Sequence, residues 1–150
     1  MKIIFSLIQT STARTSYRIS RELQGAMKRA AKIVAEGELP NIRSFALSVI
    51  ALSDEELLEI NNASLGHDWY TDVITFEIER TVDTLEAEVY ISVDRAKANA
   101  RTANVPLERE IVHLVVHAVL HLAGFDDHEA QAKKRMKSRE RFYLTALSRS

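Results

Sequence analysis

The chain has 150 residues, of which 46% are hydrophobic and 27% charged, and this balance predicts a single domain with a substantial core. The absence of cysteine excludes disulfides and thiolate metal sites and agrees with a cytoplasmic location. No stretch approaches the roughly 20 apolar residues that a membrane span requires, so we expect no membrane association. The net charge of −1 says nothing about partners.

Hydrophobic periodicity predicts, in chain order, a strand, a helix, a strand, a short helix, two strands and three helices. Their expected bounds are Lys2–Gln9, Ser20–Glu36, Ser44–Leu52, a short helix opened by Ser53, Asp72–Ile78, Glu88–Val93, Arg95–Ala103, Pro106–Ala123 and about Glu129–Leu147. This order predicts an α+β fold, in which a mixed sheet of about four strands is packed with helices.

Particular residues mark where these elements begin and end. Ser53 and Glu56 form a capping-box pattern at the start of the short helix. Asp94 is the expected N-cap of the helix that follows the last strand. We expect Gly37 to help end the first long helix and Gly124 to end the penultimate one.

The helix predicted over Pro106–Ala123 is apolar on most of its circumference, as expected for a helix buried in the core. His113, His117 and His121 recur on it at i, i+4 and i+8 and so lie near one stripe. Burying an unpaired polar group costs on the order of 1–3 kcal/mol, so each imidazole needs a partner. A lone buried histidine most often bonds a backbone carbonyl, but His117 and His121 have the spacing at which two neutral imidazoles bind one metal ion. We expect His113 to have a structural role or to orient a ligand.

A catalytic Zn²⁺ site needs a third protein ligand and leaves a fourth position for water. Gly124 lets the backbone turn through positive φ, and this turn can bring Asp127 or His128 back toward the helix. The pattern therefore predicts one zinc ion per chain, held by His117, His121 and one of these two residues.

Three segments carry a resemblance to a known family. His117–Asp127, H-A-V-L-H-L-A-G-F-D-D, resembles the H-G-x-L-H-L-x-G-Y-D-H signature of the YbeY family and, more loosely, the ligand motif of metzincin-like zinc hydrolases. His67–Phe76, H-D-W-Y-T-D-V-I-T-F, resembles that family's K-D-x-P-T-D-V-L-S-F. Glu88–Arg95, E-V-Y-I-S-V-D-R, is similar to its G-D-I-x-I-S-x-(D/E) segment. The segments occur in the family's order, whereas residues 1–50 match only in general pattern.

The resemblance implies a zincin-like α+β domain over residues 1–150, with its metal site on the central buried helix. It implies a zinc-dependent, single-strand-specific endoribonuclease that acts in rRNA maturation, at the 3′ end of the small-subunit rRNA, and in ribosome quality control. The implied partners are rRNA and the small ribosomal subunit, with ribosomal proteins or GTPases as further partners. Asp127 stands in the register of the family's third histidine, which favours it over His128 as the third ligand.

Two further positions depart from related proteins. Ala118 stands where a zinc peptidase has the glutamate that activates water, and this argues against peptide hydrolysis. Leu65 stands where the family usually has an arginine associated with catalysis or RNA contact. This departure favours an alternative, in which the chain is a ribosome-associated RNA-binding protein with a structural or vestigial metal site.

The charged residues are unevenly distributed along the chain. Between Ser53 and Asp94 twelve residues are acidic and one is basic, whereas the last twenty residues hold seven basic residues and a single acid, Glu140. A basic run of this kind is either a solvated helix face or a surface that neutralises phosphates. Under the second interpretation the candidate RNA contacts are Arg43, Arg95, Lys133, Lys134 and Lys137.

Overall fold

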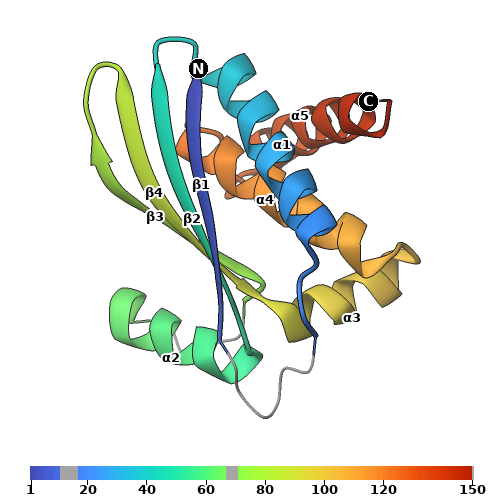
Figure 1. The fold of residues 1–150 in the computed structure, drawn as a ribbon. Helices are drawn as coiled ribbons and strands as arrows, with labels where there is room; N and C mark the ends of the chain where they lie inside the picture. The colour runs from blue at the N-terminus through green and yellow to red at the C-terminus, as the bar shows by residue number, and fades with distance from the viewer. Residues whose placement is uncertain (11–16, 67–70, 150) are drawn as a thin grey trace.

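A computed structural model describes residues 1–10, 17–66 and 71–149 of the chain (Figure 1). Its strands are β1 (Lys2–Gln9), β2 (Ser44–Leu52), β3 (Val73–Arg80) and β4 (Thr84–Ser92), and its helices are α1 (Arg21–Glu38), α2 (Asp54–Leu65), α3 (Val93–Ala103), α4 (Leu107–Leu122) and α5 (Ala130–Ser148). The predicted α+β class and the order of the predicted elements are confirmed, while the zincin-like classification stays a prediction.

The four strands form one mixed sheet in the order β1-β2-β4-β3. β1, β2 and β4 run parallel, and β3 pairs antiparallel with β4. The β3–β4 connection is a short hairpin, whereas the parallel pairs require crossovers, and α1 lies in the first of these. β3 is therefore an edge strand, and one side of its backbone is free of strand partners within the described sheet.

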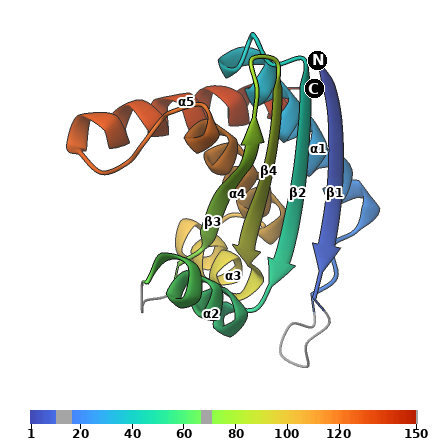
Figure 2. The same cartoon turned by 90° about the vertical axis from the view of Figure 1, so that its left-hand side faces the viewer.

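Most of the core lies between the sheet and the helices α1, α4 and α5, which cover one of its faces (Figures 1 and 2). On the opposite face, α2 covers only one end of the sheet, where a smaller buried cluster consists of Ile50, Leu52, Leu57 and Ile74. Ile4 and Ile8 of β1 are exposed on this second face. The helices thus concentrate on the side that carries the histidines.

α4 is the central helix of this layer. It packs against α1, α3 and α5 and against β3 and β4. Most of its circumference is buried, as predicted; its buried residues are Glu110, Ile111, Leu114, Val115, Val116, Ala118, Val119, Leu120 and Leu122. A helix enclosed in this way holds its remaining polar side chains at a fixed orientation relative to the sheet.

The start of β4 and the N-cap of α3 both differ from the prediction. β4 begins at Thr84 rather than Glu88, and the N-cap of α3 is Ser92, whose Oγ accepts a hydrogen bond from the Arg95 backbone N–H at 3.0 Å. Asp94 instead accepts from the backbone N–H of Asp54, at 2.9 Å, at the start of α2. The prediction of Asp94 as the N-cap was wrong because its carboxylate serves the amino end of a different helix.

Gly37 does not end α1, which continues to Glu38. A Cβ at this position would collide with the hydroxyl of Tyr143 on α5. That hydroxyl is held in place, because it donates to the Glu38 carboxylate and accepts from Arg139 at 3.3 Å. Gly37 therefore serves close packing between α1 and α5 rather than helix termination.

Among the described residues, no helix combines the length and hydrophobicity needed to cross a lipid bilayer.

We predict that Gly37→Ala destabilises the protein by about 1–3 kcal/mol, as is typical of overpacking, although alanine is the better helix former. The matched control is Gly25→Ala in the same helix, where the added Cβ would lie 3.4 Å from Nη1 of Arg29, an ordinary contact. This control should be neutral or stabilising by up to about 1 kcal/mol. Urea denaturation measures both changes, and equal effects of the two variants would contradict the packing role of Gly37.

Candidate metal centre

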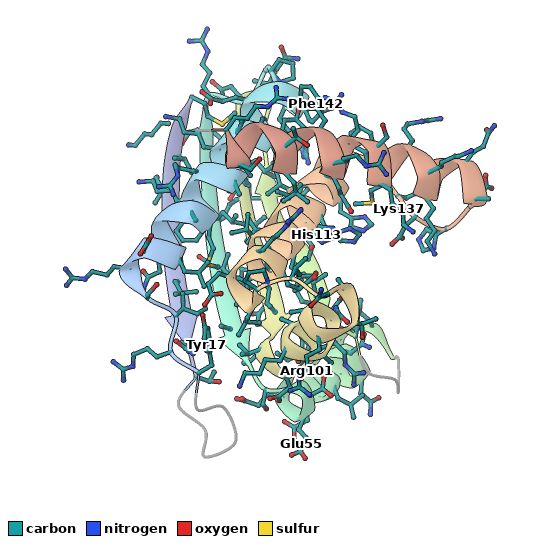
Figure 3. All side chains as sticks on the ribbon, turned by 90° about the vertical axis from the view of Figure 1, so that its right-hand side faces the viewer. Tyr17, Glu55, Arg101, His113, Lys137 and Phe142 are labelled. Carbon is teal, nitrogen blue, oxygen red and sulfur yellow. The ribbon has the colours of Figure 1, made fainter. Side chains whose placement is uncertain are left out.

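The three histidines of α4 are all partly exposed, and His113 lies on the side of the helix between α3 and α5 (Figure 3). Their register follows from the helical period, because His113, His117 and His121 are separated by four residues each and the residues between them are mostly buried. The prediction that each imidazole needs a polar partner is confirmed for all three, as described below.

Two imidazoles and one carboxylate converge at the carboxyl end of α4. Nε2 of His117 lies 3.0 Å from Nε2 of His121 and 3.9 Å from Oδ2 of Asp127. His117, His121 and Asp127 each offer one ligand atom, and these three atoms lie within 4.8 Å of one another. We call these three residues the His/His/Asp cluster.

The turn after α4 brings the carboxylate to the imidazoles. Gly124 has a φ of 101°, a conformation that glycine adopts without strain, and its N–H bonds the His121 carbonyl at 3.0 Å. Arg80 of β3 donates to the Leu122 carbonyl at 2.7 Å and so satisfies one of the last carbonyls of the helix. The end of α4 is thereby tied to the edge strand, and the chain reverses toward Asp127.

The cluster fits a divalent metal ion in both its donors and its spacing. Two nitrogens bound to one tetrahedral zinc ion at about 2.0–2.1 Å lie roughly 3.3 Å apart, close to the separation of the two Nε2 atoms. Nitrogen and carboxylate oxygen are common ligands of Zn²⁺. Burial and the neighbouring His117 lower the pKa of His121, which favours the neutral imidazole that a metal requires.

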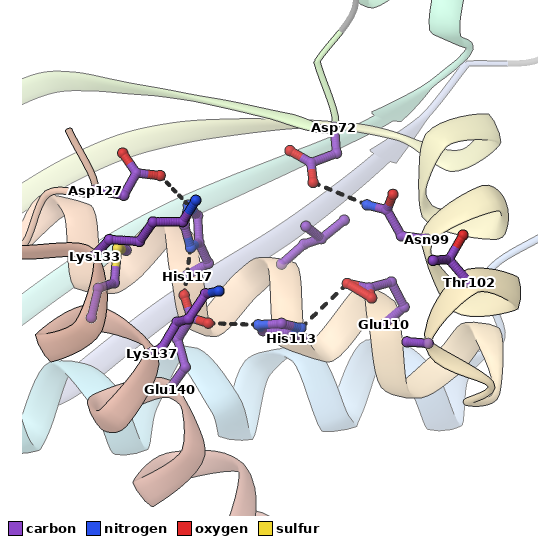
Figure 4. A pocket seen from close by; sticks show the side chains of 13 residues that line it. Asp72, Asn99, Thr102, Glu110, His113, His117, Asp127, Lys133, Lys137 and Glu140 are labelled. Atoms are coloured by element: carbon purple, nitrogen blue, oxygen red, sulfur yellow. Dashed lines mark hydrogen bonds and ion pairs between the residues drawn. The ribbon is translucent and has the colours of Figure 1, made fainter. Parts of the chain in front are cut away.

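A row of interacting charged side chains from α4 and α5 lies next to the cluster (Figure 4). Glu140 of α5 accepts from Nδ1 of His117 at 2.5 Å and from Nε2 of His113 at 2.7 Å. Nδ1 of His113 lies 3.3 Å from Glu110. Both nitrogens of His113 thus face carboxylates.

These contacts raise the pKa of His113 and lower the pKa of Glu140. Hydrogen bonds to Glu110 and Glu140 raise the pKa of His113 to about 10, so its imidazole is a cation at neutral pH. Burial alone would raise the pKa of Glu140, but the hydrogen bonds from His113 and His117 outweigh it and lower that pKa to about 2. Glu140 is therefore an ionised carboxylate held between two imidazoles.

Two cavities meet at the His/His/Asp cluster. The first has a volume of about 400 Å³ and is bounded by α3, α4 and α5. The second, of about 450 Å³, is bounded by the end of α2, the first residues of β3 and the end of α4. Asp72, His117 and Asp127 line both cavities. An extended ligand that occupies both would pass directly over the cluster.

The predicted RNA-contact residues are distributed unevenly around this site. Lys133 and Lys137 of α5 line the first cavity and face Asp72 and Asn99 across it (Figure 4). Lys134 is exposed but does not line either cavity. The two arginines lie elsewhere. Arg43 lines a separate hollow at the start of β2, and Arg95 pairs with Asp54 at 2.7 Å.

The structure also shows where Leu65, His128 and Ala118 lie, three residues considered in the comparison with related families. Leu65 is exposed at the end of α2 and lines the second cavity, as does His128. The backbone N–H of His128 donates to the Asp126 carboxylate at 3.2 Å. Ala118 is fully buried and supplies no group that could activate water. Residues 67–70, which begin one of the resembling segments, lie outside the described part of the chain.

Sequence reasoning missed Glu140, Glu110 and Asn99. Glu140 had a visible signal, because it is the single acid in a strongly basic helix and lies four residues after the buried Met136. Glu110 resembled an ordinary first-turn acid of a helix. Asn99, which donates to Asp72 at 3.0 Å, had no signal in the sequence because the contact joins α3 to the residue before β3.

Comparisons with known proteins agree with the resemblance found in the sequence. The profile of the family described as Endoribonuclease YbeY matches residues 9–148. A protein of that name from Chlorobium luteolum is 37% identical over 130 residues, which is 86% of this chain and 93% of the relative. One from Chloroherpeton thalassium is 33% identical over 133 residues, covering 88% of this chain and 92% of the relative.

A solved structure supports the fold. The solution structure of TM1509 from Thermotoga maritima aligns with a TM-score of 0.61 and 24% identity, over 96% of this chain and 89% of that one. At this level of identity the similarity concerns the fold alone.

We predict that Asp127→Ala lowers the affinity for Zn²⁺ by more than the roughly 10–100-fold loss typical of removing an outer partner of a ligand. His128→Ala should leave the affinity unchanged, because His128 is not one of the three converging groups. Competition with a chromophoric chelator measures both affinities. A larger loss in the His128 variant would identify that residue as the third ligand instead.

Proposed function

The chain belongs to the YbeY family, and from this premise we propose that it is a cytoplasmic, zinc-dependent endoribonuclease that cleaves single-stranded RNA during rRNA maturation. The observation that carries the proposal is the convergence of His117, His121 and Asp127 at the meeting point of two cavities. The names of the relatives support the endoribonuclease class.

His117, His121 and Asp127 would hold the metal ion. When bound, a divalent cation supplies Lewis-acid polarisation of a phosphoryl oxygen and activates water as a nucleophile. The chain's own residues prepare this site, because Glu140 holds one imidazole and the turn at Gly124 delivers the carboxylate. Ala118 offers no peptidase-type base, which supports a phosphodiester rather than a peptide as substrate.

The cavities on both sides of the cluster provide a path for an RNA strand. Lys133 and Lys137 line one side, where each ammonium group can neutralise a phosphate. On the other side, residues 71–75 of the edge strand and its preceding turn line the path. A single strand fits this arrangement better than a duplex, since the scissile phosphate must reach side chains that are partly buried.

In the cell, we propose that the substrate is the 3′ end of the small-subunit rRNA and that the partner is the small ribosomal subunit. Ribosomal proteins or GTPases would assist in positioning the RNA. A second candidate is an RNA-binding protein with a vestigial metal site. The exposed, apolar Leu65 in the second cavity favours this alternative, because it adds no charge where the substrate's phosphates would lie.

We predict that the zinc-loaded protein cleaves a single-stranded RNA oligonucleotide and leaves its duplex and casein intact. The double variant His117→Ala/His121→Ala should lose at least about 10²-fold in rate, because Lewis-acid stabilisation is worth several kcal/mol. A chelator should abolish cleavage and added Zn²⁺ should restore it. Gel electrophoresis of end-labelled RNA measures these rates, and binding without cleavage by the zinc-loaded wild type would support the second candidate instead.

We further predict that Leu65→Arg strengthens RNA binding and cleavage, because it places a cation in the second cavity. If it adds one phosphate contact, the dependence of log affinity on log salt concentration steepens by about 0.7 for a single strand. The matched control is Ser64→Arg, which adds the same charge to an exposed neighbouring position that does not line the cavity. Equal gains from both variants would mean that the effect is nonspecific. Fluorescence anisotropy over a salt series distinguishes the two outcomes.

A further inference from the structure

Glu140 occupies an unusual place for a carboxylate. It is the single acid of a basic helix, yet its side chain is only 10% exposed and points at α4 rather than at solvent (Figure 4). Its two oxygens are used by two different imidazoles, Oε1 by His113 and Oε2 by His117. Burial of a carboxylate is costly unless it is paired and hydrogen-bonded, and this one is satisfied on both oxygens.

The contact determines which nitrogen of His117 carries a proton. Both oxygens of Glu140 lie within hydrogen-bond distance of an imidazole nitrogen and serve as acceptors, so Nδ1 of His117 is the donor. In a neutral imidazole the lone pair then lies on Nε2, the atom that faces His121 and Asp127. Glu140 thus selects the tautomer in which His117 can act as a ligand at the cluster.

His113 fixes the carboxylate itself. It is bonded to Glu140 through one nitrogen and faces Glu110 through the other, so the Glu140 side chain cannot rotate without breaking a charged contact. Glu110 contacts His113, whereas Glu140 contacts both His113 and His117, so in this series of contacts it is Glu140 that reaches the His/His/Asp cluster.

We propose that Glu140 is the positioning residue of this site, orienting His117 and holding it in the Nδ1–H tautomer so that Nε2 can bind the metal ion. The inference rests on the proposed function in so far as it requires a metal ion at the cluster. It also assigns a role to α5, because the face of this helix that holds Glu140 carries Lys133 and Lys137, which line the same cavity. Docking of one helix would then set both the ligand geometry and the placement of the phosphate-binding lysines.

The first test measures the affinity for Zn²⁺ by chelator competition. Glu140→Gln should lower it about 10-fold and Glu140→Ala about 100-fold, the range found when an outer partner of a ligating histidine is removed. Glutamine retains one oxygen acceptor for Nδ1 of His117, which is why its loss should be smaller.

The matched control is Glu110→Gln. Glu110 is also a buried carboxylate, with 7% of its side chain exposed, but it contacts His113, which is not a residue of the cluster. Thermal unfolding of the metal-free proteins should show similar destabilisation for Glu110→Gln and Glu140→Gln, while zinc affinity falls only in the second. Equal zinc affinities in the two variants would overturn the proposal and reduce Glu140 to a structural role.

The second test reads the tautomer of His117 in the metal-free protein by long-range ¹H–¹⁵N correlation spectroscopy. The wild type should show the Nδ1–H form, and Glu140→Ala should lose this preference. A wild-type His117 in the Nε2–H form would overturn the proposal. Because this measurement needs no metal, it is independent of the proposed function. A wild type that binds no zinc but shows the Nδ1–H form would refute the metal site while supporting the orienting contact.

Discussion

The three imidazoles on a helix that is otherwise buried impose the main constraint on this structure. A polar group buried without a partner costs on the order of 1–3 kcal/mol, so the elements around α4 must supply partners along the whole stripe. Three segments supply them: Glu110 comes from the first turn of α4 itself, Asp127 from the turn between α4 and α5, and Glu140 from α5. The residues that satisfy this constraint are also those that assemble the cluster.

The position of α5 links stability to the site. Its far end is held against α1 by Tyr143, which packs over Gly37 and bonds Glu38 together with Arg139. Hydrogen bonds from Tyr143 and Arg139 outweigh burial and lower the pKa of Glu38, so these contacts favour its charged form. One helix therefore connects the core, the carboxylate behind His117 and the lysines of the first cavity.

The sheet contributes through its edge. Because β3 is the last strand in the order β1-β2-β4-β3, its first residues pair with β4 on one side only, and they also line a cavity. Arg80, near the other end of the same strand, bonds the last turn of α4. The second cavity is thus bounded by a strand and helices whose relative positions are set by the core. Leu65 contributes no charge to its lining.

The sequence by itself determined the order of the elements, the burial of α4, the spacing of His117 and His121 and the turn at Gly124, because each depends on local periodicity or backbone conformation. The turn alone left both Asp127 and His128 as candidates, and the family resemblance favoured Asp127; the folded backbone places the carboxylate of Asp127 beside the imidazoles. The tertiary structure alone decided the partners of Gly37, the separation of Arg43 and Arg95 from the cleft, and the contacts of Glu140 with two histidines. These contacts join residues more than twenty positions apart, and such pairings arise from how helices pack across a core rather than from any pattern within one helix.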